Sequence, residues 1–247
     1  MRYLITVEYD GTRYSGWQRQ KNANSVQAEL EKALAVATQE RIILMGSGRT
    51  DSGVHALGQA AHFDTACTTP PQKLAYSVNT MLPKDIQIQD IREVPEDFHA
   101  QYGAKRKTYQ YRIYLSNIHR PLKEGYAARV VPPLDYEKMV QATRDLVGEH
   151  DFEGFSSVHR SVKTTVRTVY RAEWSRNGDD LVFEIEGNGF LYNMVRIIVG
   201  TLVYVGIGKR DVDVVQKMLL TKDRTLGGKT FPPEGLYLKS VEYENLK

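Results

Sequence analysis

Cysteine is nearly absent from this chain of 247 residues, which contains Cys67 alone. One cysteine cannot form a disulfide within the chain, and such usage is typical of proteins from a reducing compartment. Paired cysteines, a His-Glu-x-x-His sequence and an aspartate-rich loop are all missing, so no metal-site spacing is present. The sequence therefore predicts no metal, and Cys67 is more typical of a core residue than of a nucleophile.

Signatures of nucleotide loops, secretion and membrane insertion are missing as well. No phosphate-binding Gly-x-x-x-x-Gly-Lys-Ser/Thr occurs, and the glycines near residue 50 have the wrong spacing for a dinucleotide fingerprint. Met1 leads directly into a strand-like segment, which predicts no signal peptide. The longest apolar run, 190–208, contains Arg196, which would be costly in mid-bilayer. We therefore expect a cytoplasmic protein without a membrane segment.

The apolar pattern predicts an α+β protein. Alternating or β-rich segments predict strands at 2–9, 42–45, 59–63, 85–94, 105–115, 164–174, 181–186 and 236–243. Helical spacing, caps such as Ser25 and proline signals predict helices at 26–37, 70–80, 135–147, 192–205 and 211–220. Asn177-Gly178-Asp179 predicts a hairpin turn between two of the strands. We expect two similar lobes, each of mixed, mostly antiparallel strands with helices on one face, sharing a central sheet with the active-site cleft between them. The expected domains are 1–104 and 105–247.

The glycine-rich stretch 46–56 is the most informative part of the sequence. It places one carboxylate, Asp51, in a loop directly after the apolar run 42–45. Glycines allow close backbone approach, and loops on a rigid scaffold often carry catalytic groups. Asp51, between neighbours that supply a cation and hydroxyls, suits a nucleophile or a base. The alternative is that Asp51 only caps the turn.

Arg196 is the second candidate, because apolar residues surround it on most of its predicted helix. A buried guanidinium needs an anionic partner or several acceptors. Asp51 is the partner we favour, since pairing would keep that carboxylate ionised and oriented. A structural ion pair with Glu184 or Glu186 is the alternative.

Two segments combine cations with tyrosines, although the net charge is only +3. Their cations are Lys105, Arg106, Lys107, Arg112, Arg120, Lys123 and Arg129 in the first, and Arg160, Lys163, Arg167, Arg171 and Arg176 in the second. This composition is typical of a surface that follows phosphates and stacks bases, although a solvated strand face is the alternative. Tyr109, on the apolar face of its strand, could stack on a nucleobase or belong to the core.

Several motifs together resemble one family. They are Tyr9-Asp10-Gly11-Thr12, Gly16-Trp17-Gln18, Gly48-Arg49-Thr50-Asp51-Ser52-Gly53-Val54-His55-Ala56, Leu82-Pro83-Lys84-Asp85-Ile86, Phe98-His99-Ala100, Lys107-Thr108-Tyr109-Gln110-Tyr111, Gly189-Phe190-Leu191-Tyr192-Asn193-Met194-Val195-Arg196 and Pro232-Pro233-Glu234-Gly235-Leu236. In this order they are similar to motifs of the tRNA pseudouridine synthase A family, over nearly the whole chain. Lys229 and Phe231 depart from the family pattern, which leaves the local pocket wall open.

The resemblance implies a function and a role for each site residue. The implied reaction turns uridine into pseudouridine at positions 38 to 40 of the tRNA anticodon stem-loop, in a homodimer without cofactor or metal. Asp51 would be the catalytic carboxylate, by a nucleophilic or an elimination route, and Arg196 would orient it. Tyr109 would stack on the flipped uracil, and Leu236 would be an apolar wall of the base pocket. Arg49 would contact phosphate or hold the place of the flipped nucleotide.

Two rival interpretations belong to other classes. The segment 7–12 resembles the nucleophile motif of haloacid-dehalogenase phosphatases, but Glu8 stands where those magnesium-dependent enzymes have aspartate. A non-catalytic RNA-binding module would explain the basic, aromatic strands. It would not explain Asp51 in a glycine loop together with a buried Arg196.

Overall fold

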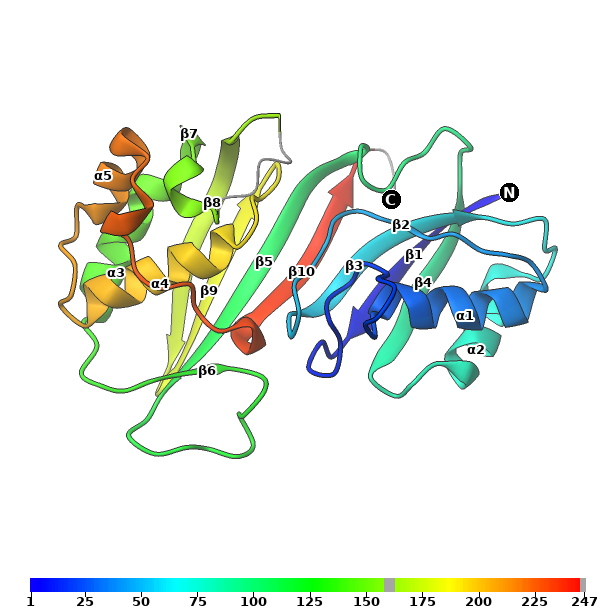
Figure 1. Ribbon diagram of the computed structural model, residues 1–247, viewed down its shortest axis with the longest axis horizontal. Helices are drawn as coiled ribbons and strands as arrows, with labels where there is room; N and C mark the ends of the chain where they lie inside the picture. Colours follow the sequence, from blue (N-terminus) through cyan, green and yellow to red (C-terminus); the bar gives the residue numbers. More distant parts are fainter. Residues whose placement is uncertain (158–162, 245–247) are drawn as a thin grey trace. The chain divides into compact units, whose positions relative to one another are not determined.

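The computed structural model describes residues 1–157 and 163–244 of the chain (Figure 1). The chain divides into two compact units. Unit 1 comprises Met1–Lys105 and Tyr237–Lys247, and unit 2 comprises Arg106–Leu236.

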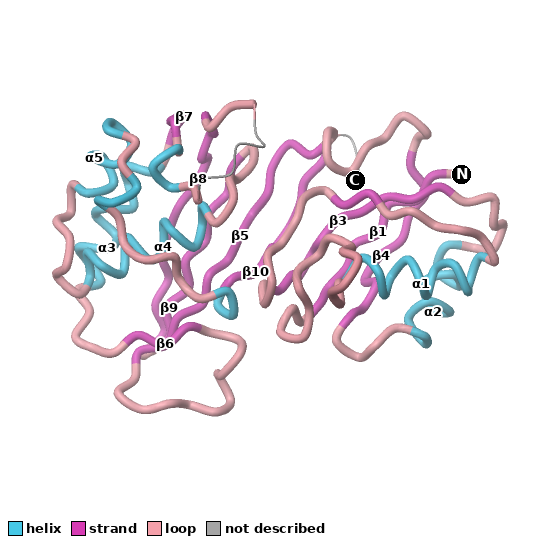
Figure 2. The backbone as a smooth tube through the Cα atoms, in the orientation of Figure 1, coloured by secondary structure: helices cyan, strands magenta, loops and turns pink. Residues whose placement is uncertain are grey.

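Both units combine mostly antiparallel strands with helices, which confirms the expected α+β class (Figure 2). The division into domains 1–104 and 105–247 stays a prediction. Within the described residues, no helix is both long enough and apolar enough to cross a bilayer. Arg160, one of the cations noted in the sequence, lies outside the described residues.

The sheet of unit 1 has the strand order β4-β1-β3-β10, and the short β2 pairs with β3. These strands are β1 (Arg2–Tyr9), β2 (Met45–Gly46), β3 (His55–Asp64), β4 (Ile86–Val94) and β10 (Leu236–Tyr243). β1 lies antiparallel between β3 and β4, whereas β10 runs parallel to β3. This parallel pairing places the last strand of the chain with the N-terminal residues.

Two helices complete unit 1, α1 (Val26–Thr38) and α2 (Pro71–Met81), and they pack side by side (Figure 1). The Ser25 hydroxyl caps α1 by accepting the Ala28 N–H at 3.4 Å, as the sequence predicted. Side chains at helical spacing, such as Leu30 and Leu34, are fully buried and supply the apolar face of α1.

The strand expected at 42–45 is wrong for most of its length, because only Met45–Gly46 joins the sheet. Leu44 is buried, but its backbone is satisfied by side chains of α1 instead of a neighbouring strand. Its N–H donates to Glu31 Oε1, and its carbonyl accepts from Gln27 Nε2, both at 3.0 Å. These buried polar residues therefore replace a ladder that the β-rich composition of the segment suggested.

The sheet of unit 2 has the order β5-β9-β8-β7, with β6 parallel to β5. Its strands are β5 (Ala104–Leu115), β6 (Ala128–Val130), β7 (Gly148–Asp151), β8 (Val166–Asn177) and β9 (Asp180–Gly187). The predicted hairpin turn joins β8 to β9, with Gly178 at φ +59°. β9 alternates between buried and half-buried residues, which gives the sheet one apolar and one polar face.

Helices cover the apolar face of this sheet (Figure 1). They are α3 (Tyr136–Thr143), α4 (Met194–Gly206) and α5 (Val214–Thr221), with short 3₁₀ turns η1 (Arg144–Leu146), η2 (Glu153–Phe155), η3 (Arg224–Leu226) and η4 (Pro233–Gly235). Each α-helix overlaps a segment that the sequence predicted as helical, and α4 and α5 end one residue beyond the predicted segments. β6 and β7, with only a few residues each, were not predicted.

His62 makes the stability of unit 1 depend on pH. It is buried on β3, and its Nδ1 accepts the Ala100 N–H at 3.1 Å. Burial, reinforced by Arg2 and His99, lowers the pKa of His62 from 6.5 to about 4. The unfolded chain therefore takes up this proton first as the pH falls, so the stability that neutral His62 confers is lost between pH 6.5 and about 4.

We expect His62→Asn, whose Oδ1 can accept the same N–H, to remove this pH dependence. The free energy of unfolding of the wild type should fall by about 3 kcal/mol more than that of the variant between pH 7 and pH 4. Urea unfolding at a series of pH values measures the difference. His119→Asn is the control, because that side chain is 69% exposed. Parallel pH profiles for the wild type and His62→Asn would refute the explanation.

Candidate active site

The loop that carries Asp51 is held by its backbone and by its neighbours. The hydroxyl groups of Tyr9 and Thr50 are hydrogen-bonded at 2.7 Å in the interior. The Trp17 N–H donates to the Thr50 carbonyl at 3.1 Å, and the Val54 N–H donates to the Asp51 carbonyl at 3.1 Å. The bond that closes this turn therefore uses the backbone carbonyl of Asp51.

Two motifs that are separate in the sequence lie against each other at this loop. His55 is buried, and its Nδ1 accepts the Gly11 N–H at 3.1 Å. On its other side the His55 ring stacks on Tyr237 of β10, with centroids 4.7 Å apart. His55 therefore joins the segment 9–12, the end of the Asp51 loop and the last strand.

The two predicted site residues of unit 1 differ in exposure. Asp51 is half-buried, so its side chain is neither sealed in the core nor fully in solvent. Arg49 is exposed, and its Nε donates to Gln18 Oε1 at 3.2 Å. Arg49 can therefore meet a ligand at the surface, next to a loop whose backbone is fixed.

In unit 2, Arg196 lies in the first turn of α4 and is held by two acceptors. Its Nε donates to the Phe231 carbonyl at 2.7 Å, and its Nη1 donates to Asn193 Oδ1 at 2.9 Å. The Phe231 N–H returns a bond to the Arg196 carbonyl at 3.1 Å. The backbone of Phe231 thus helps to hold Arg196 in place.

Tyr111 lies between Tyr109 and the segment that precedes Leu236, two of the predicted site residues of unit 2. It is fully buried on β5, two residues along the same face from Tyr109, and its hydroxyl donates to the Pro232 carbonyl at 2.6 Å. Gly235, next to Leu236, lies so close that a Cβ there would be 2.5 Å from the Tyr111 ring. Burial raises the pKa of Tyr111, whereas Arg196 acts in the opposite direction. The centroid of the Tyr111 ring lies 5.9 Å from that of the ring of Phe231, whose carbonyl Arg196 binds.

Tyr109 is half-buried, and its ring meets Phe190 edge-on at a centroid distance of 5.0 Å. Leu236 is buried at the start of β10. In unit 2, Tyr109 and Arg196 therefore lie near Tyr111. Leu236 directly follows the segment 232–235 that Tyr111 contacts. Tyr111 and Asn193 were not predicted as site residues, although both stand in the motifs that carried the resemblance, and no role was predicted for Phe231.

The acids considered as alternative partners of Arg196 contact other residues. Glu186 accepts from Arg106 Nη1 at 2.6 Å. Glu184 accepts from Gln110 at 2.9 Å and lies 3.6 Å from Arg171. These contacts lie on the polar face of the sheet, where acids offset part of the basic character of β5 and β8. That face fits the alternative of a solvated, ion-paired surface.

The opposite face of the sheet carries a different pair of cations, Lys107 on β5 and Arg167 on β8. Burial lowers the pKa of Lys107 to about 8, and the neighbouring Arg167 adds to the effect. Burial also lowers the pKa of Arg167. Lys107 shares its face with Tyr109, so two desolvated cations lie at the same end of the sheet as the predicted stacking residue.

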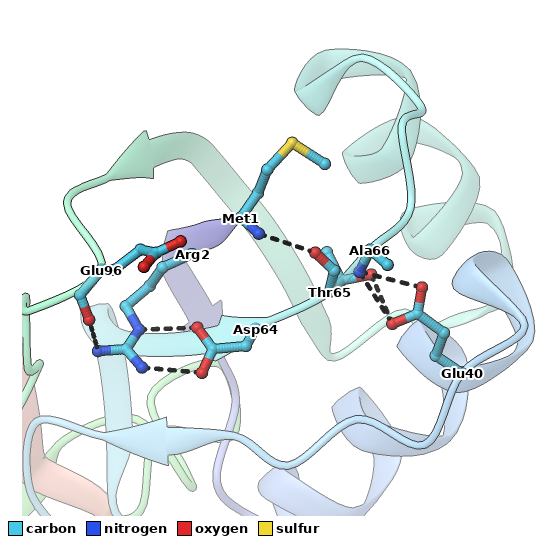
Figure 3. A pocket seen from close by; sticks show the side chains of 7 residues that line it. All are labelled: Met1, Arg2, Glu40, Asp64, Thr65, Ala66 and Glu96. Atoms are coloured by element: carbon cyan, nitrogen blue, oxygen red, sulfur yellow. Dashed lines mark hydrogen bonds and ion pairs between the residues drawn. The ribbon is translucent and has the colours of Figure 1, made fainter.

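A polar cavity of about 480 Å³ in unit 1 is lined by none of the predicted site residues (Figure 3). Its polar groups satisfy one another: Arg2 donates to both oxygens of Asp64 at 2.7 and 2.8 Å, and the Glu40 carboxylate accepts the Ala66 N–H at 3.1 Å. The Met1 nitrogen donates to the Thr65 carbonyl at 3.1 Å. The contacts of Met1 and Arg2 therefore join the start of β1 to the end of β3. Among the described residues, no group of His, Cys, Asp or Glu side chains is arranged to hold a metal ion.

Comparison with known proteins decides the family. A family model described as tRNA pseudouridine synthase matches residues 5–103 and 142–244. The chain belongs to the tRNA pseudouridine synthase family. The tRNA pseudouridine synthase A of Thermoanaerobacter sp. is 49% identical over 240 residues, covering 97% of this chain and 98% of the relative. Its counterpart in Bacillus licheniformis is 47% identical over 247 residues, covering 99% of this chain and 100% of the relative.

Membership of the tRNA pseudouridine synthase family confirms the resemblance seen in the motifs. A third relative, the tRNA pseudouridine synthase A of Exiguobacterium sp., is 46% identical over 245 residues and covers 99% of both chains. This likeness extends over nearly the full length and goes against both rival interpretations, the magnesium-dependent phosphatase and the non-catalytic RNA-binding module.

The fixed position of the Asp51 loop in this tRNA pseudouridine synthase family member depends on Gly16. Gly16 has φ +92°, and an added Cβ would lie 2.4 Å from the Thr50 carbonyl oxygen and 3.1 Å from the carbonyl carbon of Asp51. We expect Gly16→Ala to lower the free energy of unfolding by about 3 kcal/mol and to displace the loop. Urea unfolding and the rate of pseudouridine formation measure the two effects.

Gly178→Ala is the matched control for Gly16→Ala. Gly178 also has a positive φ, of +59°, but a Cβ there would meet nothing within 4 Å. It should cost only the backbone term of about 1 kcal/mol and leave the rate unchanged. Equal losses of rate in both variants would show that contact with the Asp51 loop is not what matters at Gly16.

Proposed function

We propose that this chain is an isomerase that converts uridine to pseudouridine in tRNA, at positions 38, 39 and 40 of the anticodon stem-loop. The observation that carries the proposal is the near-complete match to relatives named tRNA pseudouridine synthase A. The fixed loop around a half-buried Asp51 supports it, because the reaction needs one positioned carboxylate. We further propose that the chain acts in the cytoplasm as a homodimer, as the resemblance of its motifs to the family implies.

The proposed chemistry breaks the bond between ribose C1′ and uracil N1, turns the base, and joins C5 to C1′. The proton leaves C5 and N1 gains one, so the product is an isomer and no redox cofactor is required. Asp51 has one of two roles in this scheme. It either attacks C1′ as a nucleophile or removes a ribose proton to start an elimination. Both routes require Asp51 to be ionised and close to the ribose.

The other residues bind the substrate or orient Asp51 in this proposal. Tyr109 stacks on the uracil after it leaves the helical stack, and Leu236 forms an apolar wall for the base. Arg196 orients the Asp51 carboxylate and keeps it ionised. Arg49, exposed beside the catalytic loop, contacts a backbone phosphate or fills the place of the flipped nucleotide.

Lys107 and Arg167 support a polyanionic substrate on the side of β5 that carries Tyr109. The charged forms of both side chains are disfavoured in this place, because each is desolvated and they repel each other. A phosphate backbone in that place would offset both costs. The polar face of the same sheet is less suited, because its cations already face Glu184 and Glu186.

An incubation with unmodified tRNA tests the proposal. The purified chain is mixed with a transcript that carries uridine at positions 38, 39 and 40, and with transcripts in which single uridines are replaced by cytidine. Carbodiimide labelling followed by reverse transcription then maps pseudouridine. We expect signals at those positions only, each lost when its uridine is replaced.

Two outcomes would contradict the proposal in different ways. Binding of tRNA without any carbodiimide signal would favour a non-catalytic RNA-binding protein. Signals confined to other positions would keep the reaction but overturn the assignment of the anticodon stem-loop.

A further inference from the structure

Asn193 departs from the usual rule for the residue that caps the start of a helix. It is the N-cap of α4, where asparagine ordinarily has an extended backbone and accepts an N–H of the first turn. Here Asn193 has φ 60° and ψ 5°, in the left-handed region, and its side chain makes no capping bond. It is one of three non-glycine residues with positive φ among the described residues. This backbone conformation is strained for most side chains, so other interactions must offset the strain.

The amide of Asn193 is used away from the helix backbone instead. Its Oδ1 accepts from Arg196 Nη1 at 2.9 Å, and its Nδ2 donates to the Ser157 hydroxyl at 3.0 Å. The Ser157 N–H in turn donates to the Tyr192 carbonyl at 3.2 Å. The Asn193 amide is thereby fixed at its nitrogen by Ser157, and its oxygen binds the guanidinium of Arg196.

Two acceptors of Arg196 lie in different parts of unit 2. The Phe231 carbonyl takes Nε, and Asn193 takes Nη1. Free arginine side chains have several rotamers, so two acceptors are needed to define both the position and the rotation of the planar group. A carboxylate in two-pronged contact with Arg196 would then meet the Nη1–Nη2 end, in an orientation set by Asn193.

We propose that Asn193 is a positioning residue for Arg196, and that its left-handed backbone is retained because it aims the amide at the guanidinium. Asparagine is suited to both demands, since it tolerates this conformation better than most residues and has a donor and an acceptor on one planar group. Glycine would satisfy the backbone alone. Aspartate would lack the donor for Ser157 and would add a charge that competes for Arg196. The inference rests on the proposed role of Arg196 in pseudouridine formation.

The first test is Asn193→Gly, which keeps the backbone conformation and removes only the amide. We expect the single-turnover rate of pseudouridine formation to fall about thirtyfold, because the guanidinium loses its orientation. The dissociation constant for tRNA and the melting temperature should stay close to those of the wild type. Gln39→Gly is the control, since Gln39 also has a positive φ of 59° at the end of α1. It should leave the rate unchanged.

A second variant separates positioning from a general structural role. Ser157→Ala removes the anchor of the Asn193 amide, so it should slow the reaction by a smaller factor. The double variant Asn193→Gly with Ser157→Ala should be no slower than Asn193→Gly alone, because both act through one contact. In an Arg196→Lys background, Asn193→Gly should likewise add little.

A wild-type rate in Asn193→Gly would overturn the inference. So would multiplicative effects in either double variant, or a loss of rate fully explained by lower tRNA affinity or lower stability. These results differ from failure of the proposed function, in which the wild type itself would form no pseudouridine.

Discussion

Asp51→Asn should abolish pseudouridine formation while tRNA binding persists. The amide has nearly the same shape as the carboxylate, and the contacts that hold the loop come from Tyr9, Trp17 and Val54. We therefore expect the fold to be kept and the single-turnover rate to fall about a thousandfold or more. The dissociation constant for tRNA should stay within about tenfold, because many phosphate contacts contribute to it.

Carbodiimide mapping after single turnover and filter binding of labelled tRNA measure these two quantities. Asp90→Asn is the control, since that side chain on β4 is 54% exposed and should leave both unchanged. Turnover that survives in Asp51→Asn would remove Asp51 from the role of catalytic carboxylate. A parallel collapse of binding and rate would show that the substitution damages the tRNA site instead.

Arg196→Met should slow the reaction about a hundredfold or more while changing tRNA affinity little. Methionine keeps most of the stem but loses the charge and the donors. It removes the Arg196 donors of the Phe231 carbonyl and of Asn193 Oδ1, so we also expect a loss of stability of about 2 kcal/mol. The rate must therefore be measured well below the melting temperature of the variant.

Arg210→Met is the matched control for this stability loss. Arg210 also holds backbone carbonyls of unit 2, those of Leu226 and Lys209, at 2.5 and 3.0 Å. It should lower the melting temperature in a similar way and leave the rate unchanged. A wild-type rate in Arg196→Met would show that the proposed orientation of Asp51 is not needed for the reaction.

Local chemistry in the sequence was sufficient for much of the fold. The Ser25 cap, the turn at 177–179 and the alternation along β5 depend on neighbours close in sequence, and each appears in the structure as expected. The strand predicted at 42–45 was wrong for most of its length, because the backbone of Leu44 is hydrogen-bonded to Gln27 and Glu31, two side chains on a helix. Strand propensity does not reveal whether a backbone will be satisfied by a strand or by side chains.

The setting of the candidate site could not be predicted in the same way. Tyr111 and Pro232 are 121 residues apart, and Arg196 and Phe231 are 35 apart. No periodicity specifies which of many buried segments will meet at such separations. The left-handed backbone of Asn193 is also invisible in the sequence, because asparagine at a helix start ordinarily predicts a cap.

Release of tritium from C5 of uridine is the most direct test of the account. Pseudouridine formation must expel that hydrogen, because C5 becomes the atom bonded to ribose. The purified chain should release one tritium for each pseudouridine that carbodiimide labelling detects at positions 38 to 40, and Asp51→Asn should release none. A wild-type chain that binds the labelled tRNA and releases no tritium would contradict the account.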